Sequence, residues 1–316
     1  MLYKNTIKMI FSNFNMVWEL LAYLLIIFLV TAIPSFFLIT PIFNRISSAE
    51  GFKSLITLVK EFSTDFNLNQ LLSNFFDQIV LGYNIVIDNI NSLWIYLVLL
   101  VFICIFAVNF LRGLYNVTIC NILNYGMSSN TKFNFMSSFV QTFKENCLYQ
   151  LLYLVTYFPL KLLVYFITFL TFKLYGVGGF ISVIAPFITV LTYTILYSII
   201  NTVFSCWVPL IIVRGYDPVK SLKQSFKVVR RRLLKTFSNS FAVVITILFI
   251  NMFVGVFTFG AGLIITIPTS FLLICAFNML TYYFCNGLKF YIDSTSVVAP
   301  IKVGYTEKFK KHKYII

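Results

Sequence analysis

Six long apolar runs constrain the fold of this chain more than any other feature of its sequence. A helix that crosses the hydrocarbon core of a bilayer needs about 20 apolar residues. We predict spans at residues 17–40, 92–111, 148–174, 180–213, 240–259 and 263–288. The chain is 59% hydrophobic and 11% charged, whereas soluble domains are roughly 25% charged. These features predict an all-α, polytopic integral membrane protein.

Prolines interrupt several of these runs. Pro34, in the first run, can be absorbed as a kink in a membrane helix. The fourth run carries no charge and is too long for one simple span. Either Pro186 separates a short interfacial piece from the true span, or the helix projects beyond the lipid. Residues 17–38 are too long for a typical signal core and lack a clear cleavage site, so we expect a retained signal anchor.

A basic amphipathic helix is predicted over residues 217–237, between the fourth and fifth runs. Asp217 can accept from free N–H groups at the helix start, and Pro218 is tolerated at the first helical position. Apolar residues recur every three or four positions on one face: Val219, Leu222, Phe226, Val229 and Leu233. The basic side chains are Lys220, Lys223, Lys227, Arg230, Arg231, Arg232 and Lys235.

A helix of this composition is typical of one that lies on an anionic membrane surface. We therefore predict that these basic residues form a lipid-binding or partner-binding surface. The alternative is that the charges only fix the orientation of the chain in the membrane. Both roles can hold together.

A short motif occurs twice, each time before a pair of spans. Residues 138–144 read SFVQTFK and residues 221–227 read SLKQSFK. An Arg-Gly pair closes the preceding span in each case, at residues 112–113 and 214–215. The apolar positions correspond as Met136, Phe139 and Phe143 with Val219, Leu222 and Phe226.

The N-terminus contains a weaker third version of this motif. Its apolar stripe and the lysines opposite are Ile7, Ile10, Phe11 and Phe14 with Lys4 and Lys8. We predict a threefold parallel repeat, in which each unit is a cytoplasmic interfacial helix followed by two spans.

The basic residues predict the orientation. Most of the 24 Lys and Arg residues lie before the first span, after the second and fourth, and after the sixth. Because cytoplasmic segments carry an excess of Lys and Arg, we expect both termini to be cytoplasmic in a cell membrane. Residues 41–91 are then an extracytoplasmic loop. We predict one transmembrane domain over residues 1–290 and a basic cytoplasmic tail over residues 291–316.

Few residues suit catalysis or metal binding. His312 is the only histidine, and the sequence has no P-loop, GxGxxG or HExxH motif. The cysteines show no CxxC spacing and read as small apolar residues. We therefore predict no catalytic, cofactor-binding or metal site and no enzyme activity. The net charge is +14, and the basic residues lie between the predicted spans. This placement favours lipid headgroups over nucleic acid as the binding partner.

Lys161 is the one basic residue that could lie within the hydrocarbon, where ionisable groups are functional candidates by default. If Pro159 begins the span proper, Lys161 instead lies near the cytoplasmic boundary and its ammonium extends to water. We favour this second alternative because no acid lies deep within a span to pair with it. Glu19, at the inner edge of the first span, could approach Lys161, a pairing that a double-mutant cycle would test.

Residues 209–237 read PLIIVRGYDPVKSLKQSFKVVRRRLLKTF, which is a span exit, a short turn and a Ser-containing basic helix. This pattern resembles the membrane domain attached to some bacterial glycerophosphoryl diester phosphodiesterases and its stand-alone relatives of unassigned function. The six-span layout over about residues 1–290 is similar to that domain. The acids and histidines of a phosphodiesterase domain are not found. The resemblance implies a membrane architecture and no enzymatic activity.

These features favour a non-enzymatic multi-pass membrane protein that organises lipid or a membrane protein complex. The expected partners are anionic lipid headgroups and other membrane proteins, with no nucleic acid. The alternative is a transporter or export-system component, which the repeated hairpins and the prolines within the spans favour. A membrane enzyme that acts on lipid ranks third, since the acids of residues 41–91 are spread along a loop.

Overall fold

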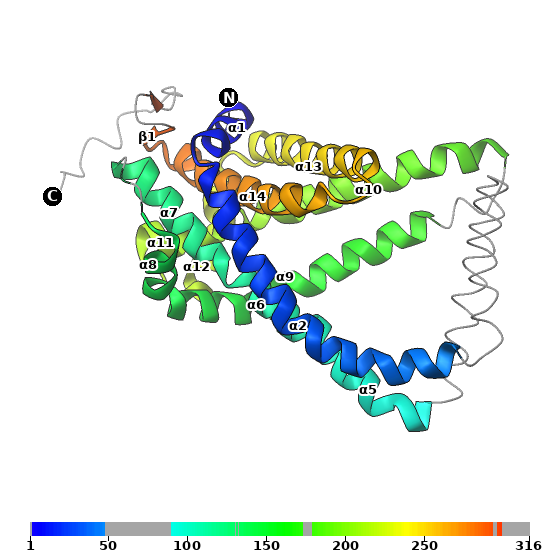
Figure 1. Cartoon of the computed structure of the whole chain (residues 1–316). Helices are drawn as coiled ribbons and strands as arrows, with labels where there is room; N and C mark the ends of the chain where they lie inside the picture. The colour runs from blue at the N-terminus through cyan, green and yellow to red at the C-terminus, as the bar shows by residue number, and fades with distance from the viewer. Residues whose placement is uncertain are drawn as a thin grey trace. The chain divides into compact units, whose positions relative to one another are not determined.

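The computed structural model describes residues 2–47, 90–129, 131, 133–172, 179–292 and 296–298. These residues are helical almost throughout, with one short antiparallel pair of strands near the C-terminal end (Figure 1). The predicted all-α class is therefore confirmed. Most of the predicted loop, at residues 48–89, and the tail from residue 299, including His312, lie outside the described residues.

The elements follow the chain in the order labelled in Figure 1. The first half contains α1 (Leu2–Ser12), α2 (Asn15–Ser47), α5 (Ile90–Phe102), the π-helix η1 (Ile103–Val108), α6 (Asn109–Gly113), α7 (Tyr115–Ser129) and α8 (Phe135–Gln141). The second half contains α9 (Phe143–Phe172), α10 (Gly179–Phe204), α11 (Trp207–Arg214), α12 (Pro218–Arg230), α13 (Leu233–Phe257), α14 (Leu263–Asn286), β1 (Phe290–Tyr291) and β2 (Val297–Val298).

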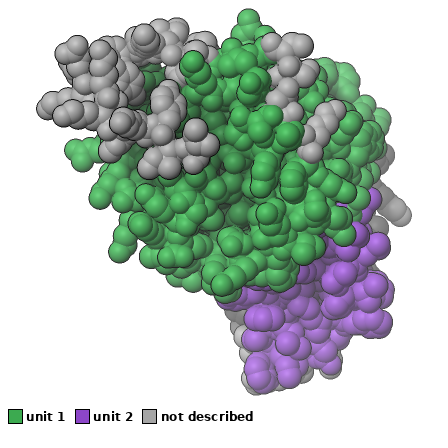
Figure 2. Space-filling view, turned by 90° about the vertical axis from the view of Figure 1, so that its left-hand side faces the viewer, with its two compact units in different colours: residues 1–22, 113–171, 187–316 green, residues 23–112, 172–186 purple. Residues whose placement is uncertain are grey.

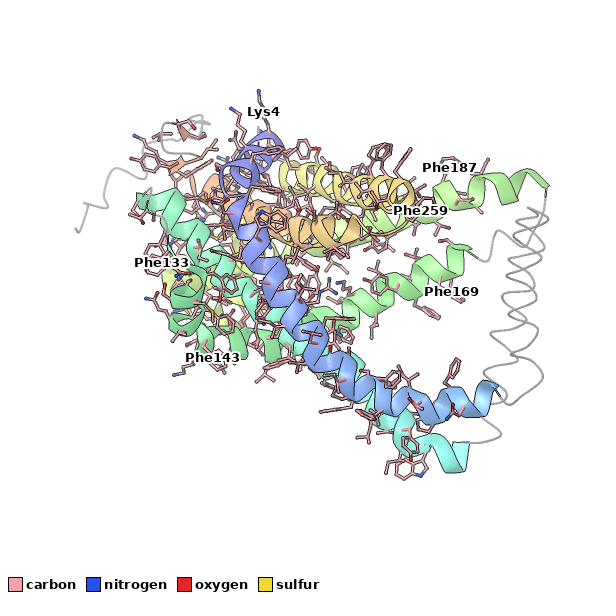
Figure 3. The ribbon with its side chains drawn as sticks, in the orientation of Figure 1. Lys4, Phe133, Phe143, Phe169, Phe187 and Phe259 are labelled. Carbon is pink, nitrogen blue, oxygen red and sulfur yellow. The ribbon has the colours of Figure 1, made fainter. Side chains whose placement is uncertain are left out.

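Six helical stretches among the described residues are long and apolar enough to cross a membrane, as predicted. They are Asn15–Asn44, Trp94–Ser129, Phe143–Thr171, Ile184–Arg214, Leu233–Phe257 and Leu263–Asn286. Large apolar side chains are exposed along these stretches, among them Phe36, Val98, Phe166 and Phe249. Figure 3 labels two more, Phe169 and Phe187. Exposed apolar surface of this extent marks a membrane or protein contact. The six helices are those of a multi-pass membrane protein.

The prolines of the spans lie inside helices, as the sequence predicted for Pro34. Pro34 and Pro159 lie inside α2 and α9, and α9 already begins at Phe143. Pro186 lies inside α10, so it does not separate an interfacial piece from the fourth span. That run is instead interrupted by a turn at residues 205–206, between α10 and α11.

Helix α7 was not predicted, because its residues were assigned to a cytoplasmic connection between the second and third spans. It continues the second apolar stretch up to Ser129. Residues 117–123 of α7 are all buried, including the polar Thr118 and Asn121. A helix that is buried on every side lacks the one-sided apolar pattern by which helices are recognised.

The chain divides into two compact units, and the single transmembrane domain over residues 1–290 stays a prediction. Unit 1 comprises Met1–Ala22, Gly113–Thr171 and Phe187–Ile316, and unit 2 comprises Tyr23–Arg112 and Phe172–Pro186 (Figure 2). Within unit 2, the Tyr23 hydroxyl donates to the carbonyl oxygen of Leu111 at 2.6 Å. This bond ties α2 to α6.

Unit 1 is built around α14, whose second half is buried almost throughout between Leu272 and Cys285. Helices α1 and α13 pack on α14, and α7 packs against both α14 and α11. Strand β1 lies against α7, and the Ser12 hydroxyl donates to the carbonyl oxygen of Ile292 at 2.9 Å. The first residues of the predicted tail are therefore docked on unit 1.

A buried polar network joins α7 to α8 and α9. The Asn146 side-chain amide donates to the hydroxyls of Thr118 and Thr142 at 2.8 and 3.1 Å. The Oδ1 atom of Asn146 accepts from the backbone N–H of Val117 at 3.1 Å. Because buried polar groups cost free energy unless they are hydrogen-bonded, this network fixes how α9 lies on α7.

Gly113→Ala is expected to destabilise unit 1. A Cβ atom at this position would overlap the side chain of Gln150, which is itself buried. Overpacking costs about 1–3 kcal/mol, so the unfolding temperature in detergent should fall. Gly126→Ala is the matched control, because no atom lies within 4 Å of the added Cβ and Ala favours a helix. Equal unfolding temperatures for the two variants would contradict this close approach of Gly113 and Gln150.

Candidate functional site

Helix α12 begins at Pro218, as predicted, and its first turn is held mainly by its neighbour α11. Gly215 ends α11 with a left-handed backbone, at φ 60°, and the Trp207 indole N–H donates to the carbonyl oxygen of Pro218 at 2.8 Å. Asp217 occupies the N-cap position but makes no side-chain capping bond. Trp207 is buried in this contact.

The face of α12 that packs on the protein consists mainly of small residues. Pro218, Ser221, Ser225 and Val229 are buried. The Ser225 hydroxyl donates to the carbonyl oxygen of Val203, on α10, at 3.0 Å. Small side chains allow two helices to approach closely, and hydroxyls satisfy the nearby carbonyls.

The predicted apolar stripe of α12 does not face the protein as a whole. Val219 is 50% exposed and Phe226 48% exposed, whereas Val229 is buried. Lys220, Lys223 and Lys227 are exposed as well. At 100° per residue, Val219 and Phe226 lie between the buried small face and the lysines. Helix α12 therefore has three faces: one buried and small, one exposed and apolar, and one exposed and basic.

The predicted basic helix 217–237 is interrupted. Helix α12 ends at Arg230, residues 231–232 form a turn, and α13 begins at Leu233, so Lys235 belongs to α13. Arg230, Arg231 and Lys235 are exposed. Arg232 is half-buried, and its guanidinium carbon lies 4.4 Å from the centroid of the Phe284 ring. The predicted basic surface is thus divided between two helices and the turn that joins them.

Helix α8 and the first turn of α9 divide their residues in the same way as α12. The buried small positions and the exposed apolar positions correspond in sequence. These pairs are Ser138 with Ser221, Thr142 with Ser225, Met136 with Val219, and Phe143 with Phe226. Lys144 follows Phe143, which Figure 3 labels, and is exposed like Lys227.

The predicted N-terminal stripe is split between two faces of α1. Ile10 is buried against the rest of unit 1 together with Leu2, Thr6 and Met9, while Phe11 is 75% exposed. Lys4 projects away from the helix (Figure 3). Helix α1 thus also buries one face, which includes a hydroxyl residue, and exposes a large aromatic residue.

The two Arg-Gly pairs do not occupy equivalent places, contrary to the prediction. Gly215 ends α11 and is followed directly by the turn into α12. Gly113 ends α6 and is followed by α7, which separates it from α8. The Arg214 side-chain Nε donates to the Tyr282 hydroxyl at 3.1 Å, which ties the end of α11 to α14.

The two predicted intramembrane charges lie on different helices of unit 1. Glu19 is exposed on α2, and Lys161 is half-buried in the interior of α9. The Lys161 ammonium lies 5.8 Å from the centroid of the Tyr197 ring. Their pairing stays a prediction.

Sequence reasoning missed a row of tyrosines that includes Lys161. Tyr149, Tyr153, Tyr157, Lys161 and Tyr165 recur at every fourth position of α9, and we name them the tyrosine–lysine row. Residues four apart are neighbours on a helix. The spacing is visible in the sequence, but aromatic residues are so frequent in this chain that it did not stand out.

No three His, Cys, Asp or Glu side chains gather to hold a metal among the residues that the structure describes. No family model matches the chain, and neither curated proteins nor solved structures give a significant match. The resemblance to the phosphodiesterase membrane domain therefore stays a prediction.

Ser225→Leu is expected to displace α12 from unit 1. Ser225 is 1% exposed, so a Leu side chain must push the helices apart at a cost of about 1–3 kcal/mol. Val219→Leu adds an apolar carbon on the exposed face of the same helix and should leave stability nearly unchanged. Thermal unfolding in detergent compares the two variants. If Ser225→Leu unfolds no earlier than Val219→Leu, the small face of α12 is not its packing face.

Proposed function

We propose that this chain is a non-enzymatic multi-pass membrane protein that gathers anionic lipid headgroups on its basic helices. The three-faced arrangement of α12 is the observation that carries this proposal. The helix is fixed to the protein through Ser221 and Ser225. It therefore keeps Val219, Phe226 and its lysines available to an outside surface.

An anionic membrane surface fits both exposed faces of α12. The side chains of Val219 and Phe226 can enter the boundary between headgroups and acyl chains, where apolar surface is favourable. The adjacent lysines then reach lipid phosphates, and each contributes about 1 kcal/mol near an anionic leaflet. A water-soluble partner would match the basic face but leave the aromatic ring exposed.

Helix α8 and the first turn of α9 have buried small residues and exposed apolar residues at the positions that correspond to those of α12, which supports a repeated interfacial helix. Met136 and Phe143 are exposed beside Lys144, as Val219 and Phe226 are beside Lys227. We propose that α1, α8 and α12 are the interfacial helices of three parallel units. In this arrangement they all lie at the cytoplasmic leaflet, and both termini are cytoplasmic.

Replacing Lys220, Lys223 and Lys227 together by Gln is expected to remove the preference for anionic lipid. Three charges at about 1 kcal/mol each correspond to roughly a hundredfold in affinity. The measurement is a titration of the detergent-solubilised protein with phosphatidylglycerol and, separately, phosphatidylcholine. Replacing the same lysines by Arg keeps the charge and should keep the preference. An unchanged preference in the Gln variant would overturn the proposal.

The proposed orientation predicts which side of the membrane exposes α12. Lys223→Cys, introduced in a Cys-free background, is expected to react with a membrane-impermeant thiol reagent only in inside-out vesicles. Because Lys223 is exposed, the protein does not shield a thiol at this position, and only the membrane limits access of the reagent. If the cysteine at this position were labelled in intact cells, α12 would lie on the outer face of the membrane, and the proposed orientation would be wrong.

A further inference from the structure

The turn between α13 and α14 is closed by its own hydrogen bonds. Every backbone N–H group from Thr258 to Thr266 donates to an oxygen atom of residues 254–262. Eight of these groups donate to backbone carbonyls, and that of Gly262 donates to the Thr258 hydroxyl at 2.8 Å. The same hydroxyl donates to the carbonyl oxygen of Val254 at 2.6 Å. The N–H groups of this turn therefore need no water.

The turn that leads into α12 is different. The first four N–H groups of a helix have no partner within the helix, so they usually depend on a cap or on water. Those of Val219 and Lys220 have no partner among the described residues, and Asp217 makes no side-chain capping bond. The first four N–H groups of α14, from Leu263 to Thr266, are all bonded within the turn. Backbone groups must be satisfied in this way wherever water is absent.

The α13–α14 turn and the helices that it joins also carry no charge. No Asp, Glu, Lys or Arg occurs between Lys235 and Lys289, and residues 258–262 read TFGAG. At 1.5 Å per residue, the distance from Lys235 to Phe259 along α13 is about 36 Å. With an average tilt of about 20°, this distance is close to the 30 Å or so of a hydrocarbon core. The turn therefore reaches the far boundary of the hydrocarbon without a charged residue to place in water.

Phe259 projects outward from this turn. Its side chain is 99% exposed, and Figure 3 labels it at the end of the hairpin that is farther from α1. Its φ is 49°, a left-handed conformation that is strained for a bulky residue. The turn is tightly packed behind the ring, because a Cβ atom at Gly262 would overlap the side chain of Val254. A strained, closely packed turn thus directs an aromatic ring away from the protein.

The apolar surface of the turn continues that of α13. Phe249, Phe253 and Phe257 recur at every fourth position and are all exposed. Consecutive ring centroids of this row lie 6.1 and 4.3 Å apart. Ile264, on the other side of the turn, is exposed as well. The surface along which a spanning helix meets lipid therefore extends over the turn without a polar boundary.

We infer that the α13–α14 turn inserts into the lipid leaflet opposite α12 and places the Phe259 ring among phospholipid acyl chains. The ring gains from leaving water, and the closed hydrogen bonds remove the cost of immersing the backbone. This contact goes beyond the proposed function, since it uses no basic residue and needs no anionic headgroup. The hairpin is then held by charges at one leaflet and by an aromatic ring at the other.

The test places a fluorescent label in the turn of the full chain. Phe259→Cys is labelled in detergent with a maleimide of the dye NBD, and the protein is reconstituted into phosphatidylcholine vesicles. Nitroxide groups on the acyl chains of added lipids quench a dye within the bilayer, whereas iodide quenches a dye in water. We expect the nitroxide lipids to remove most of the emission at this position and iodide to remove little of it.

Two further variants serve as controls. Asp217→Cys lies in the turn before α12 and is exposed, so its label should be quenched by iodide and little by deep nitroxides. Ala261→Cys keeps Phe259 in place and should give the result expected for Phe259→Cys. It decides the test if Phe259→Cys unfolds at a lower temperature than the wild type. The wild type treated with the same reagent gives the background, which is low at its buried thiols Cys120, Cys206, Cys275 and Cys285.

Two outcomes would overturn the inference. Quenching by iodide at the tested position places the turn in water. Protection from both quenchers means that protein covers the turn, for example a second copy of this chain. Because these vesicles contain no anionic lipid, either outcome leaves the proposed binding of anionic headgroups by α12 standing. Conversely, loss of that binding proposal leaves the insertion of the turn unaffected.

Discussion

The structure depends first on the need to satisfy every backbone polar group where water is absent. A chain in hydrocarbon meets this need within each segment only as a helix, and all six candidate spans are helical. Hydroxyl side chains inside the spans follow the same constraint. Those of Thr31, Thr246 and Ser270 each donate to the carbonyl oxygen four residues earlier, at 2.7 to 2.8 Å. The polar residues of these helices thus cost little, and the long apolar runs can tolerate them.

The sequence therefore predicted where the helices occur better than it predicted which face of each helix is buried. Periodicity identified the exposed positions Val219 and Phe226 as a stripe, but it could not say which surroundings the stripe meets. In a soluble protein an apolar stripe packs on the core, whereas in this chain Ser221 and Ser225 pack inward and the apolar residues remain outside. Helix α7 could not be predicted for a related reason, because burial on all sides leaves no periodic contrast between faces.

The small residues of α12 explain why a basic helix can be both fixed and available. A helix held only by its apolar side chains would lose contact with the protein when these enter lipid. The Ser225 hydroxyl instead bonds to the Val203 carbonyl, and Trp207 bonds to Pro218, so neither contact uses an apolar side chain of α12. The surface that we propose for lipid is thereby separated from the surface that holds the helix.

Trp207 connects the buried face of α12 to the helices of the candidate spans. Tryptophans of membrane proteins are enriched at the two interfaces, and Trp18 and Trp94 are exposed near the ends of candidate spans, whereas Trp207 is 1% exposed. Its indole N–H donates to the carbonyl oxygen of Pro218, and its ring packs against the ring of Tyr149. One side chain therefore joins the start of α12 to the start of the tyrosine–lysine row. This junction fixes the start of α12 against the first turns of α9, because neither element can shift without breaking a buried contact.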